Sequence, residues 1–390
     1  MDKKINILTL SDHPLSPSGV GTQTQNVMRA LLDTGKFKIF SLGGAMKHMD
    51  YTPIKVEDFG DDWMIQPVDD YGTPEMIKSI IRTEKIDILW FMTDPRFYEW
   101  LWASENEIRP HVPMVYYHVW DNYPYPSFNT KWYASNDCIA TISKVTDDIV
   151  KTLVPDVRSE YIPHAVDDKI FAPMTDLDRK TFRKQAFQVD DDEKLVVFWN
   201  NRNARRKQSG TLIYWFKELL DIIGEDSAKL IMHTEPHDPN GQDLYAILSE
   251  LGVKEGQIAL SNQKIPPKML ANMYAAADLT VNISDAEGFG LATLESLSCG
   301  TPILVTMTGG LQEQVTDGKG NWFGQGIQPT SKAIIGSQQV PWIYEDRIRK
   351  EDFLEAMKDL YEIGHEERRK LGDLGRNHVM NNYNFKNFNK

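Results

Sequence analysis

The stretch LTVNISDAEGFGLATLE, residues 279–295, decides the fold. It opens with Leu279–Ile283, a short run dominated by apolar residues, as expected of a strand that is buried on both faces. Gly288 and Gly290 then permit a turn, and Gly290–Cys299 carries a helical pattern. A strand, a glycine turn and a helix in this order form the repeating unit of a parallel α/β sheet.

The same alternation extends over the whole chain, which predicts an α/β fold with parallel sheets. The other predicted strands lie at Ile5–Leu10, Phe37–Leu42, Ile86–Met92, Pro113–Tyr117, Leu195–Trp199, Leu230–His233 and Pro302–Thr306. The other predicted helices lie at Thr22–Leu32, Thr73–Glu84, Ser143–Leu153, Gln208–Ile223, Gln242–Leu251, Pro267–Ala277, Lys350–Ile363 and Glu366–Asn382.

The length of 390 residues suggests two domains. The strand–helix rhythm pauses at Asp167–Lys194, which is rich in charged residues, so we place a linker there. We predict Rossmann-like domains over residues 1–170 and 171–365, which face each other across a deep cleft. Because ligands of open α/β sheets bind at the carboxyl ends of strands, functional residues are expected in the loops after strands. Residues 324–346 break the pattern and are predicted to form a surface excursion.

Composition excludes some functions. The chain has 43 Lys and Arg against 56 Asp and Glu, a formal net charge of −13. This charge argues against indiscriminate binding to nucleic acid or anionic membranes, although local basic patches stay possible. Apolar runs fall far short of the roughly 20 residues that span a bilayer, and we find no signal peptide. We therefore expect a soluble cytoplasmic protein. Two cysteines and unpaired histidines predict neither a disulfide framework nor a metal site.

A basic cluster follows the predicted strand at 195–199. It contains Arg202, Arg205, Arg206 and Lys207. Arginine offers a planar fork to two phosphate oxygens, and lysine offers a compact charge. We assign phosphate binding to Arg202 and Lys207, and a solvated turn to Arg205 and Arg206.

Two carboxylates flank the glycine turn of the opening stretch, eight residues apart at Glu287 and Glu295. Carboxylates bind sugar and ribose hydroxyls well because each accepts several hydrogen bonds. The alternative is a capping role for Glu287 and an exposed helix face for Glu295. The turn at Gly288–Gly290 and the pair Gly309-Gly310 offer backbone N–H groups to an anion.

Two features of the N-terminal half have competing interpretations. Gly19 and Gly21 open a helix after the first strand, which suits an oxyanion or merely a tight turn. The aromatic segment 116–133 could stack an acceptor or pack in the core, and core packing is favoured for most of it. The exceptions are His118 and Asp121. We assign acceptor contacts to Asp121 and Tyr123.

Together these motifs resemble retaining GT-B glycosyltransferases of family 4. The C-terminal part of the resemblance is Glu287-Gly-Phe-Gly with Glu295, then Gly300-Thr-Pro and Gly309-Gly-Leu-Gln-Glu313. Arg202 and Lys207 match the family's basic pair, Gly19-Val-Gly21 its N-terminal loop, and His118 its active-site histidine. Tyr161–Asp167 resembles its domain junction. Two departures are Asn201 in place of a glycine, and His233–Gly241 in place of a glycine-rich turn. The latter could contact the base or cap the sheet.

The resemblance implies a GT-B fold and a nucleotide-sugar donor. In it, Arg202 and Lys207 hold the diphosphate, Glu295 the ribose and Glu287 the transferred sugar, with His118 near the reacting centre. The whole predicted donor set is Gly19, Gly21, Arg202, Lys207, Glu287, Gly288, Phe289, Gly290, Leu291 and Glu295. Residues 366–390 are expected to form a helix that crosses back to the first domain. No cofactor or metal is required.

We therefore expect a retaining transferase that uses a UDP-sugar, in preference to a GDP-sugar, and a hydroxyl on a glycan or glycolipid. His118, Glu287, Arg202 and Lys207 are its predicted catalytic residues. A hydroxymethylated DNA base as acceptor is an alternative that the net charge disfavours, and a non-catalytic nucleotide-sugar-binding protein is another. A metal-dependent GT-A enzyme is disfavoured because the Asp-x-Asp matches at 176–178 and 190–192 lie in the predicted linker.

Overall fold

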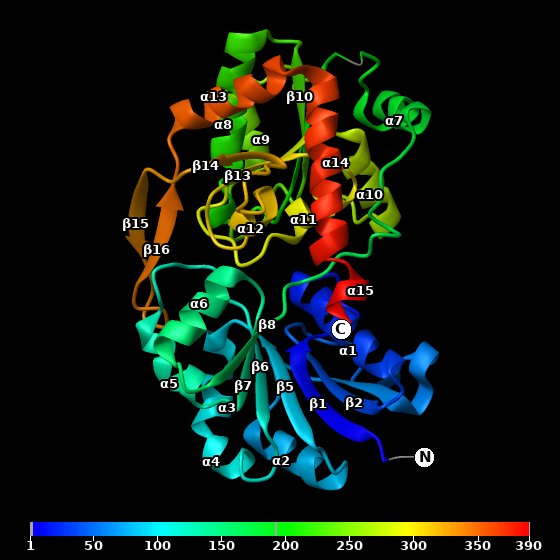
Figure 1. Ribbon diagram of the computed structural model, residues 1–390, viewed down its shortest axis with the longest axis vertical. Helices are drawn as coiled ribbons and strands as arrows, with labels where there is room; N and C mark the ends of the chain where they lie inside the picture. Colours follow the sequence, from blue (N-terminus) through cyan, green and yellow to red (C-terminus); the bar gives the residue numbers. More distant parts are fainter. Residues whose placement is uncertain (1–2, 192, 390) are drawn as a thin grey trace. The chain divides into compact units, whose positions relative to one another are not determined.

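The computed structural model describes residues 3–191 and 193–389 (Figure 1). Residues 1, 2, 192 and 390, which fall within the predicted domain ranges, lie outside the described residues. The chain divides into two compact units. Unit 1 comprises the described residues up to His164 together with Gly336–Ile343, and unit 2 comprises Ala165–Ile335 and Tyr344–Phe388.

Unit 1 is built on an eight-stranded sheet with the order β3-β4-β2-β1-β5-β6-β7-β8. All of its pairs are parallel except β3 with β4. The strands are β1 (Ile5–Asp12), β2 (Phe37–Gly44), β3 (Ile54–Lys55), β4 (Trp63–Pro67), β5 (Ile88–Thr93), β6 (Met114–His118), β7 (Cys138–Thr141) and β8 (Arg158–Tyr161).

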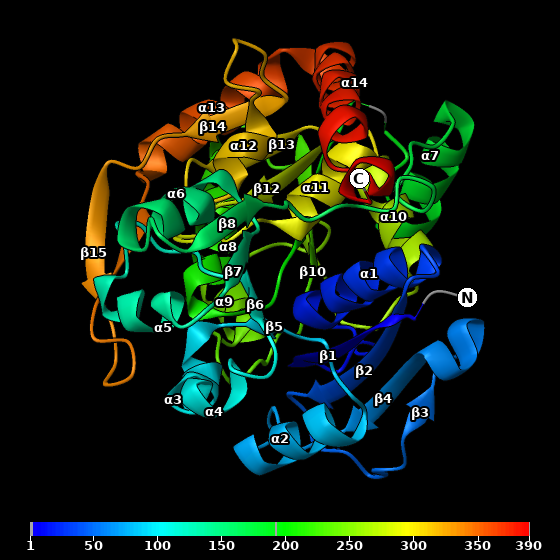
Figure 2. The ribbon, with the colours of Figure 1, turned by 60° about the horizontal axis from the view of Figure 1, so that its bottom comes forward.

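The helices of unit 1 begin where the sequence supplies caps. The Thr73 side chain caps α2 and Pro74 occupies its first turn, while Ser143 and Thr146 form a capping box on α6. Helix α1 packs against β1 and β2 (Figure 2). The helices are α1 (Gly19–Asp33), α2 (Pro74–Thr83), α3 (Glu99–Ala103), α4 (Glu105–Ile108), α5 (Thr130–Ala134) and α6 (Lys144–Leu153).

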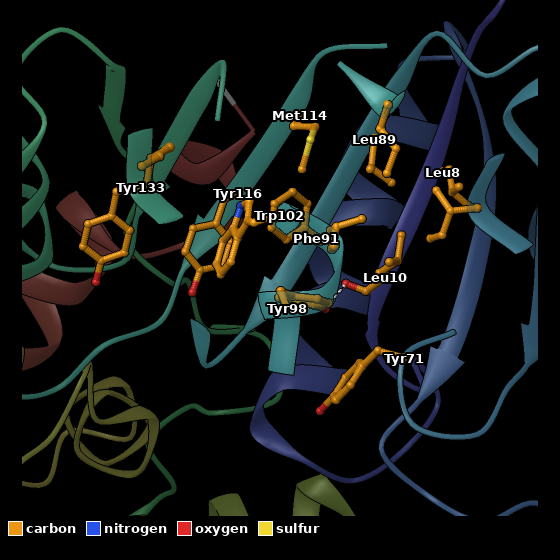
Figure 3. Packing of buried hydrophobic residues seen from close by; sticks show 14 of the residues in the cluster. Leu8, Leu10, Tyr71, Leu89, Phe91, Tyr98, Trp102, Met114, Tyr116 and Tyr133 are labelled. Carbon is orange, nitrogen blue, oxygen red and sulfur yellow. Dashed lines mark hydrogen bonds between the residues drawn. The ribbon is translucent and has the colours of Figure 1, made fainter. Parts of the chain in front are cut away.

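The core of unit 1 is unusually aromatic (Figure 3). Phe91 stacks on Tyr116 with ring centroids 5.1 Å apart, and the Tyr98 hydroxyl donates to the Leu10 carbonyl at 2.8 Å. Tyr116, Trp120 and Tyr133 are buried in this cluster, as core packing predicts for the aromatic segment. The hydroxyl of a buried tyrosine needs a partner, which the backbone provides here.

Unit 2 contains a six-stranded, fully parallel sheet with the order β11-β10-β9-β12-β13-β14. The strands of unit 2 are β9 (Leu195–Asn200), β10 (Ala228–His233), β11 (Ile258–Ser261), β12 (Leu279–Asn282), β13 (Ile303–Thr306), β14 (Gly324–Ile327) and β15 (Ser331–Ile335). A further strand, β16 (Ile343–Arg347), pairs with β15 in a separate two-stranded sheet.

The helices of unit 2 cover both faces of its sheet. Leu195, Val197 and Trp199 of β9 share a core cluster with α8 and α13, whereas Phe198 meets Tyr274 of α10 at 4.9 Å. This two-sided burial explains the continuous apolar run. The helices are α7 (Asp176–Phe182), α8 (Ser209–Ile223), α9 (Leu244–Glu250), α10 (Pro267–Ala276), α11 (Leu291–Ser298), α12 (Leu311–Val315), α13 (Lys350–Glu362), α14 (Gly364–Asn382) and α15 (Phe385–Phe388).

The predicted α/β fold with two Rossmann-like parallel-sheet domains is confirmed, and some segments are used differently than predicted. The charged stretch Asp167–Lys194 contains α7 and belongs to unit 2 instead of forming a free linker. Gly336–Ile343, within the expected surface excursion, groups with unit 1, where Val340 joins the core cluster. Helix α14 packs against α11 within unit 2 (Figure 1). The crossing of residues 366–390 to the first domain stays a prediction.

Among the residues that the structure describes, none of the helices combines the length and the apolar character needed to cross a bilayer.

Candidate functional site

The loops after β9 and β12 bring together two of the predicted site residues in unit 2. These strands are neighbours and run parallel, so their following loops begin at the same edge of the sheet. The Lys207 ammonium forms an ion pair with Oε2 of Glu287. Their side chains are only 9% and 12% exposed. A charge pair so shielded from water interacts much more strongly than one on the surface.

The environment of Glu287 keeps its carboxylate ionised. Burial raises the pKa of Glu287, but the charges of Lys207 and Arg206 outweigh burial, and the net result is a pKa below the usual range. Asn282, at the end of β12, adds a long amide contact to the same carboxylate oxygen at 3.4 Å. An ionised carboxylate is a pure hydrogen-bond acceptor, which suits the binding of hydroxyl groups.

Arg202 lies in the same loop but has a different partner. Its Nε and Nη2 atoms donate to the two carboxylate oxygens of Asp238 at 2.6 and 3.2 Å. The Arg202 side chain is 63% exposed, so this fork is accessible to solvent. The contact with Arg202 is the main reason that the pKa of Asp238 is lowered to about 2.

The segment His233–Gly241 braces the loop after β9. A Cβ on Gly241 would lie 1.9 Å from the Asn203 carbonyl oxygen, so only glycine fits there. Asn203 is buried, and its amide donates to the Gln242 carbonyl at 2.6 Å. These contacts join the segment to the loop after β9, while the base contact and the sheet cap both stay predictions. Asn203 belongs to no recognisable motif, and its partners Pro236 and Gln242 lie more than thirty residues away in the sequence.

The Arg205 side chain is 57% exposed, as the solvated turn predicts, whereas Arg206 is half-buried; both also contact neighbouring loops. Arg205 makes a two-pronged contact with the buried Glu345 carboxylate at 2.7 and 2.6 Å. Arg206 donates to the Ala286 carbonyl at 2.5 Å, directly before Glu287. Both arginines therefore shape the surroundings of the Lys207–Glu287 pair.

The glycine turn ahead of α11 depends on very close backbone packing. Gly290 has a φ of +94°, which favours glycine. A Cβ on Gly309 would lie 1.8 Å from the Glu287 carbonyl oxygen, and one on Gly310 would lie 2.6 Å from the Phe289 Cα. No side chain caps α11, so the first-turn N–H groups at Leu291 keep their capacity for an anion.

Glu295 occupies a protected position on α11 and not the exposed helix face of the alternative interpretation. Burial raises its pKa to about 7, and a hydrogen bond with Tyr274 opposes that shift. The Tyr274 hydroxyl also accepts a hydrogen bond from Asn200, at the end of β9, at 2.8 Å. Glu295 is thus connected to the same sheet edge as the basic loop, and its carboxyl group titrates near neutral pH.

In unit 1, Gly21 serves a tight turn at the start of α1. A Cβ on Gly21 would lie 2.4 Å from the Ser16 hydroxyl oxygen. The Ser18 side chain caps the helix and accepts from the Gly21 N–H at 2.9 Å. This geometry agrees with the tight-turn interpretation, while the donor role of Gly19 and Gly21 stays a prediction.

His118 is the last residue of β6 and is fully buried. Its Nε2 lies 2.8 Å from the Tyr133 hydroxyl, and its Nδ1 has no partner. Burial lowers the pKa of His118 to about 3, so the imidazole is neutral at physiological pH. The two predicted acceptor residues follow β6: Tyr123 is 47% exposed and Asp121 is half-buried. Both belong to unit 1, as does His118.

Within the described ranges, no group of three or more His, Cys, Asp or Glu residues is arranged to hold a metal ion.

One protein-family model matches this chain, and the match lies within unit 2. Residues 179–335, all in unit 2, match the model of the family "Glycosyl transferases group 1". A D-inositol 3-phosphate glycosyltransferase from Acidothermus cellulolyticus is 35% identical over 131 residues, which are 33% of this chain and 27% of that protein. The chain spans less than half the length of the first curated relatives it matches.

Solved structures share the fold over nearly the whole chain. Sucrose-phosphate synthase from Thermosynechococcus elongatus covers 99% of this chain and 96% of its own, with a TM-score of 0.77 and 17% identity. Anabaena HepE, solved with UDP and glucose, covers 99% and 97%, with a TM-score of 0.70 and 14% identity. The chain therefore has the GT-B fold, and residues 179–335 of its second unit match the glycosyl transferases group 1 model.

Proposed function

We propose that this protein is a retaining glycosyltransferase that moves a sugar from a nucleoside diphosphate sugar to a hydroxyl group of a glycan or glycolipid. The observation that carries the proposal is the shielded Lys207–Glu287 pair beside the uncapped N-terminus of α11. A cation, a carboxylate and free N–H groups at one sheet edge are what a sugar diphosphate requires.

In this proposal, the diphosphate lies against Lys207 and the N–H groups that open α11. Negative charge grows on the leaving diphosphate as the anomeric C–O bond breaks. Fixed positive groups stabilise that charge more in the transition state than in the ground state, so no metal is needed. Arg202 supplies a second cation, and its 63% exposure lets it turn from Asp238 to the ligand without a change in the core.

The two glutamates take separate roles. Ionised Glu287 accepts hydrogen bonds from hydroxyls of the transferred sugar, and Lys207 is shared between this carboxylate and the diphosphate. Glu295 binds the ribose. We do not assign Glu287 as a nucleophile, because its carboxylate is held by Lys207 and Asn282. The acceptor oxygen attacks from the face that the diphosphate leaves, and its proton passes to the departing phosphate oxygen.

Unit 1 supplies the remaining contacts of the proposal. We assign His118 a position near the reacting centre as a neutral imidazole; its side chain is buried and its Nδ1 has no protein partner. Asp121 and Tyr123 contact the acceptor. We propose UDP as the donor nucleotide in preference to GDP.

A donor panel tests the proposal. UDP-, GDP- and ADP-sugars are added to the protein, and thermal stability and release of nucleoside diphosphate are measured. We expect a UDP-sugar to stabilise the protein and to be turned over. Lys207→Ala should lower turnover by about 10²–10³-fold, the typical effect of removing one group that stabilises developing negative charge.

The matched control is Lys254→Ala, since Lys254 forms an exposed ion pair with Glu225 in unit 2. This variant should behave as the unmodified protein. A panel without binding or turnover would refute the donor assignment, and binding without turnover would identify a non-catalytic nucleotide-sugar-binding protein.

A further inference from the structure

A second cluster of charges lies at the opposite ends of the same strands in unit 2. Asp278 directly precedes β12, and its side chain is 1% exposed. The Asp278 carboxylate accepts a hydrogen bond from the Val196 N–H, near the start of β9, at 2.7 Å. The cluster therefore belongs to the amino ends of the strands, whereas Lys207 and Glu287 follow their carboxyl ends.

Two buried guanidinium groups share the single carboxylate of Asp278. Arg179 contacts Oδ1 at 2.5 Å and Arg183 contacts Oδ2 at 2.8 Å. Their side chains are 8% and 1% exposed. Nδ1 of His365, at the start of α14, lies 3.1 Å from Oδ1 of the same carboxylate.

A third buried guanidinium, that of Arg368, adds to the positive charge. Arg368 is 3% exposed and donates from Nη1 to the carbonyls of Leu360 and Tyr361, but its Nε has no hydrogen-bond partner. A buried donor without a partner is costly, and an uncompensated buried charge is more so. The arginines Arg179, Arg183 and Arg368 outnumber the one buried carboxylate, Asp278, so the cluster carries an excess of positive charge.

A cavity opens onto this cluster. Its volume is 40 Å³, and its walls include Arg179, His365, Arg368, Arg369 and the segment Gly300–Pro302. One water needs about 10–15 Å³ by this measure, so the cavity has room for a group of several atoms. A wider hollow, also lined by Arg179, His365 and Arg369, adjoins these residues.

Helix α14, which contributes His365 and Arg368, makes this site more favourable for an anion. Helix α14 has 19 residues, and no side chain caps its N-terminus. Gly364 and His365 of its first turn line the wider hollow. Besides Asp278, the acidic residues that line the two hollows are all exposed: Asp176, Glu193, Glu366, Glu367 and Asp373. Asp176 is paired with Arg369. Asp176 interacts electrostatically with Arg179, and Glu193 with Arg368, but water screens exposed carboxylates, so they offset the buried positive charge only in part.

We propose that this cavity is a binding site for a phosphate group, either inorganic phosphate or the end of a small phosphomonoester. The phosphate is flanked by Arg179, His365, Arg368 and Arg369, and it offsets the excess charge of the cluster. Arginine forks match phosphate oxygens in geometry as well as charge. The site is independent of the donor site and of the transferase activity proposed for it.

Thermal unfolding of the full chain, with inorganic phosphate or chloride at equal ionic strength, tests this site. Phosphate at about ten times its dissociation constant should raise the Tm of the unmodified protein by about 3–6 °C. Arg368→Met should abolish the shift. Arg158→Met, which removes an exposed arginine of unit 1, should retain it.

Further variants and ligands test whether the Tm shift arises from binding in this cavity. Lys207→Ala should retain it, because Lys207 lies at the other ends of the strands. If Arg368→Met does not fold, Arg368→Lys keeps the charge without the fork and should bind phosphate more weakly in equilibrium dialysis. Glycerol phosphate distinguishes an ester, which would bind more tightly than inorganic phosphate, from the free anion. The proposal is overturned if phosphate gives no shift, if the shift survives Arg368→Met, or if Lys207→Ala alone removes it.

Discussion

The two ends of β9 and β12 carry charged clusters of opposite design. At the carboxyl ends, Lys207 and Glu287 form one pair beside glycine turns, and the nearby Arg202 fork is open to water. At the amino ends, Asp278 is locked between Arg179 and Arg183 with almost no exposure. Loops that can exchange partners suit ligand binding, whereas a fully satisfied buried carboxylate secures the strands. The difference predicts that the carboxyl-end residues govern activity and Asp278 governs stability.

The largest expected effect is that of Asp278→Asn on stability. Burial raises the pKa of Asp278, but His365 and the two arginines outweigh burial and keep the pKa well below its usual range. Loss of this carboxylate leaves Arg179 and Arg183 buried without a counter-charge. We expect the free energy of unfolding of unit 2 to fall by about 3–5 kcal/mol, measured in urea. Asp221→Asn, which removes a 55% exposed carboxylate paired with Lys217, is the control and should change it by less than about 0.5 kcal/mol. If both variants lost the same stability, the special role of Asp278 in securing the fold would be contradicted.

Unlike Asp278→Asn, the variant Glu287→Gln should lower activity strongly and stability only slightly. The amide oxygen can still accept from Lys207, so we expect the stability loss to be smaller than for Asp278→Asn. The charge that orients the sugar is lost, and turnover of the matched donor should fall by about 10²-fold. Steady-state release of nucleoside diphosphate measures this. Retained turnover would remove Glu287 from the donor site.

Glu295→Gln should change how the free energy of unfolding depends on pH. The pKa of Glu295 is raised to about 7, so the folded state binds a proton more tightly than the unfolded state does. This group therefore lowers stability as pH rises from about 4.5 through 7. The glutamine variant lacks this loss, so its stability relative to the unmodified protein should increase between pH 5 and 8, by on the order of 1–3 kcal/mol. Urea unfolding across this range tests it, and parallel curves for the two proteins would contradict it.

The smallest expected stability effect is that of Arg202→Gln. The Arg202 side chain is 63% exposed and that of Asp238 is 9% exposed, so water screens this pair from the arginine side and the contact should contribute about 1 kcal/mol. Donor affinity should nonetheless fall by about tenfold, the equivalent of about 1.4 kcal/mol. Calorimetric titration of the donor measures the affinity. A large stability loss with unchanged affinity would place Arg202 with Asp278 among the residues that secure the fold.

Much of the fold was predictable because it depends on local sequence patterns. The continuous apolar run Leu195–Trp199 is buried on both faces, as its composition indicates. The caps at Thr73 and Ser143 begin helices because a side-chain oxygen satisfies a free N–H. The site was partly predictable for the same reason, since Lys207 and Glu287 each follow a recognisable strand. Gly336–Ile343 was not, because its partners in unit 1 are remote in sequence.

The sequence by itself determined the order of strands, turns and helices, and hence which residues sit at the carboxyl ends of β9 and β12. Period and glycine placement act over a few residues, so they can be read directly. Only the tertiary structure decided the partners: Glu287 for Lys207, Asp238 for Arg202 and Asp278 for two arginines. With 56 acidic and 43 basic residues in the chain, charge alone cannot select one pair across 80 or 95 positions. Packing of the sheet makes that selection, because it fixes which loops and strand ends lie side by side.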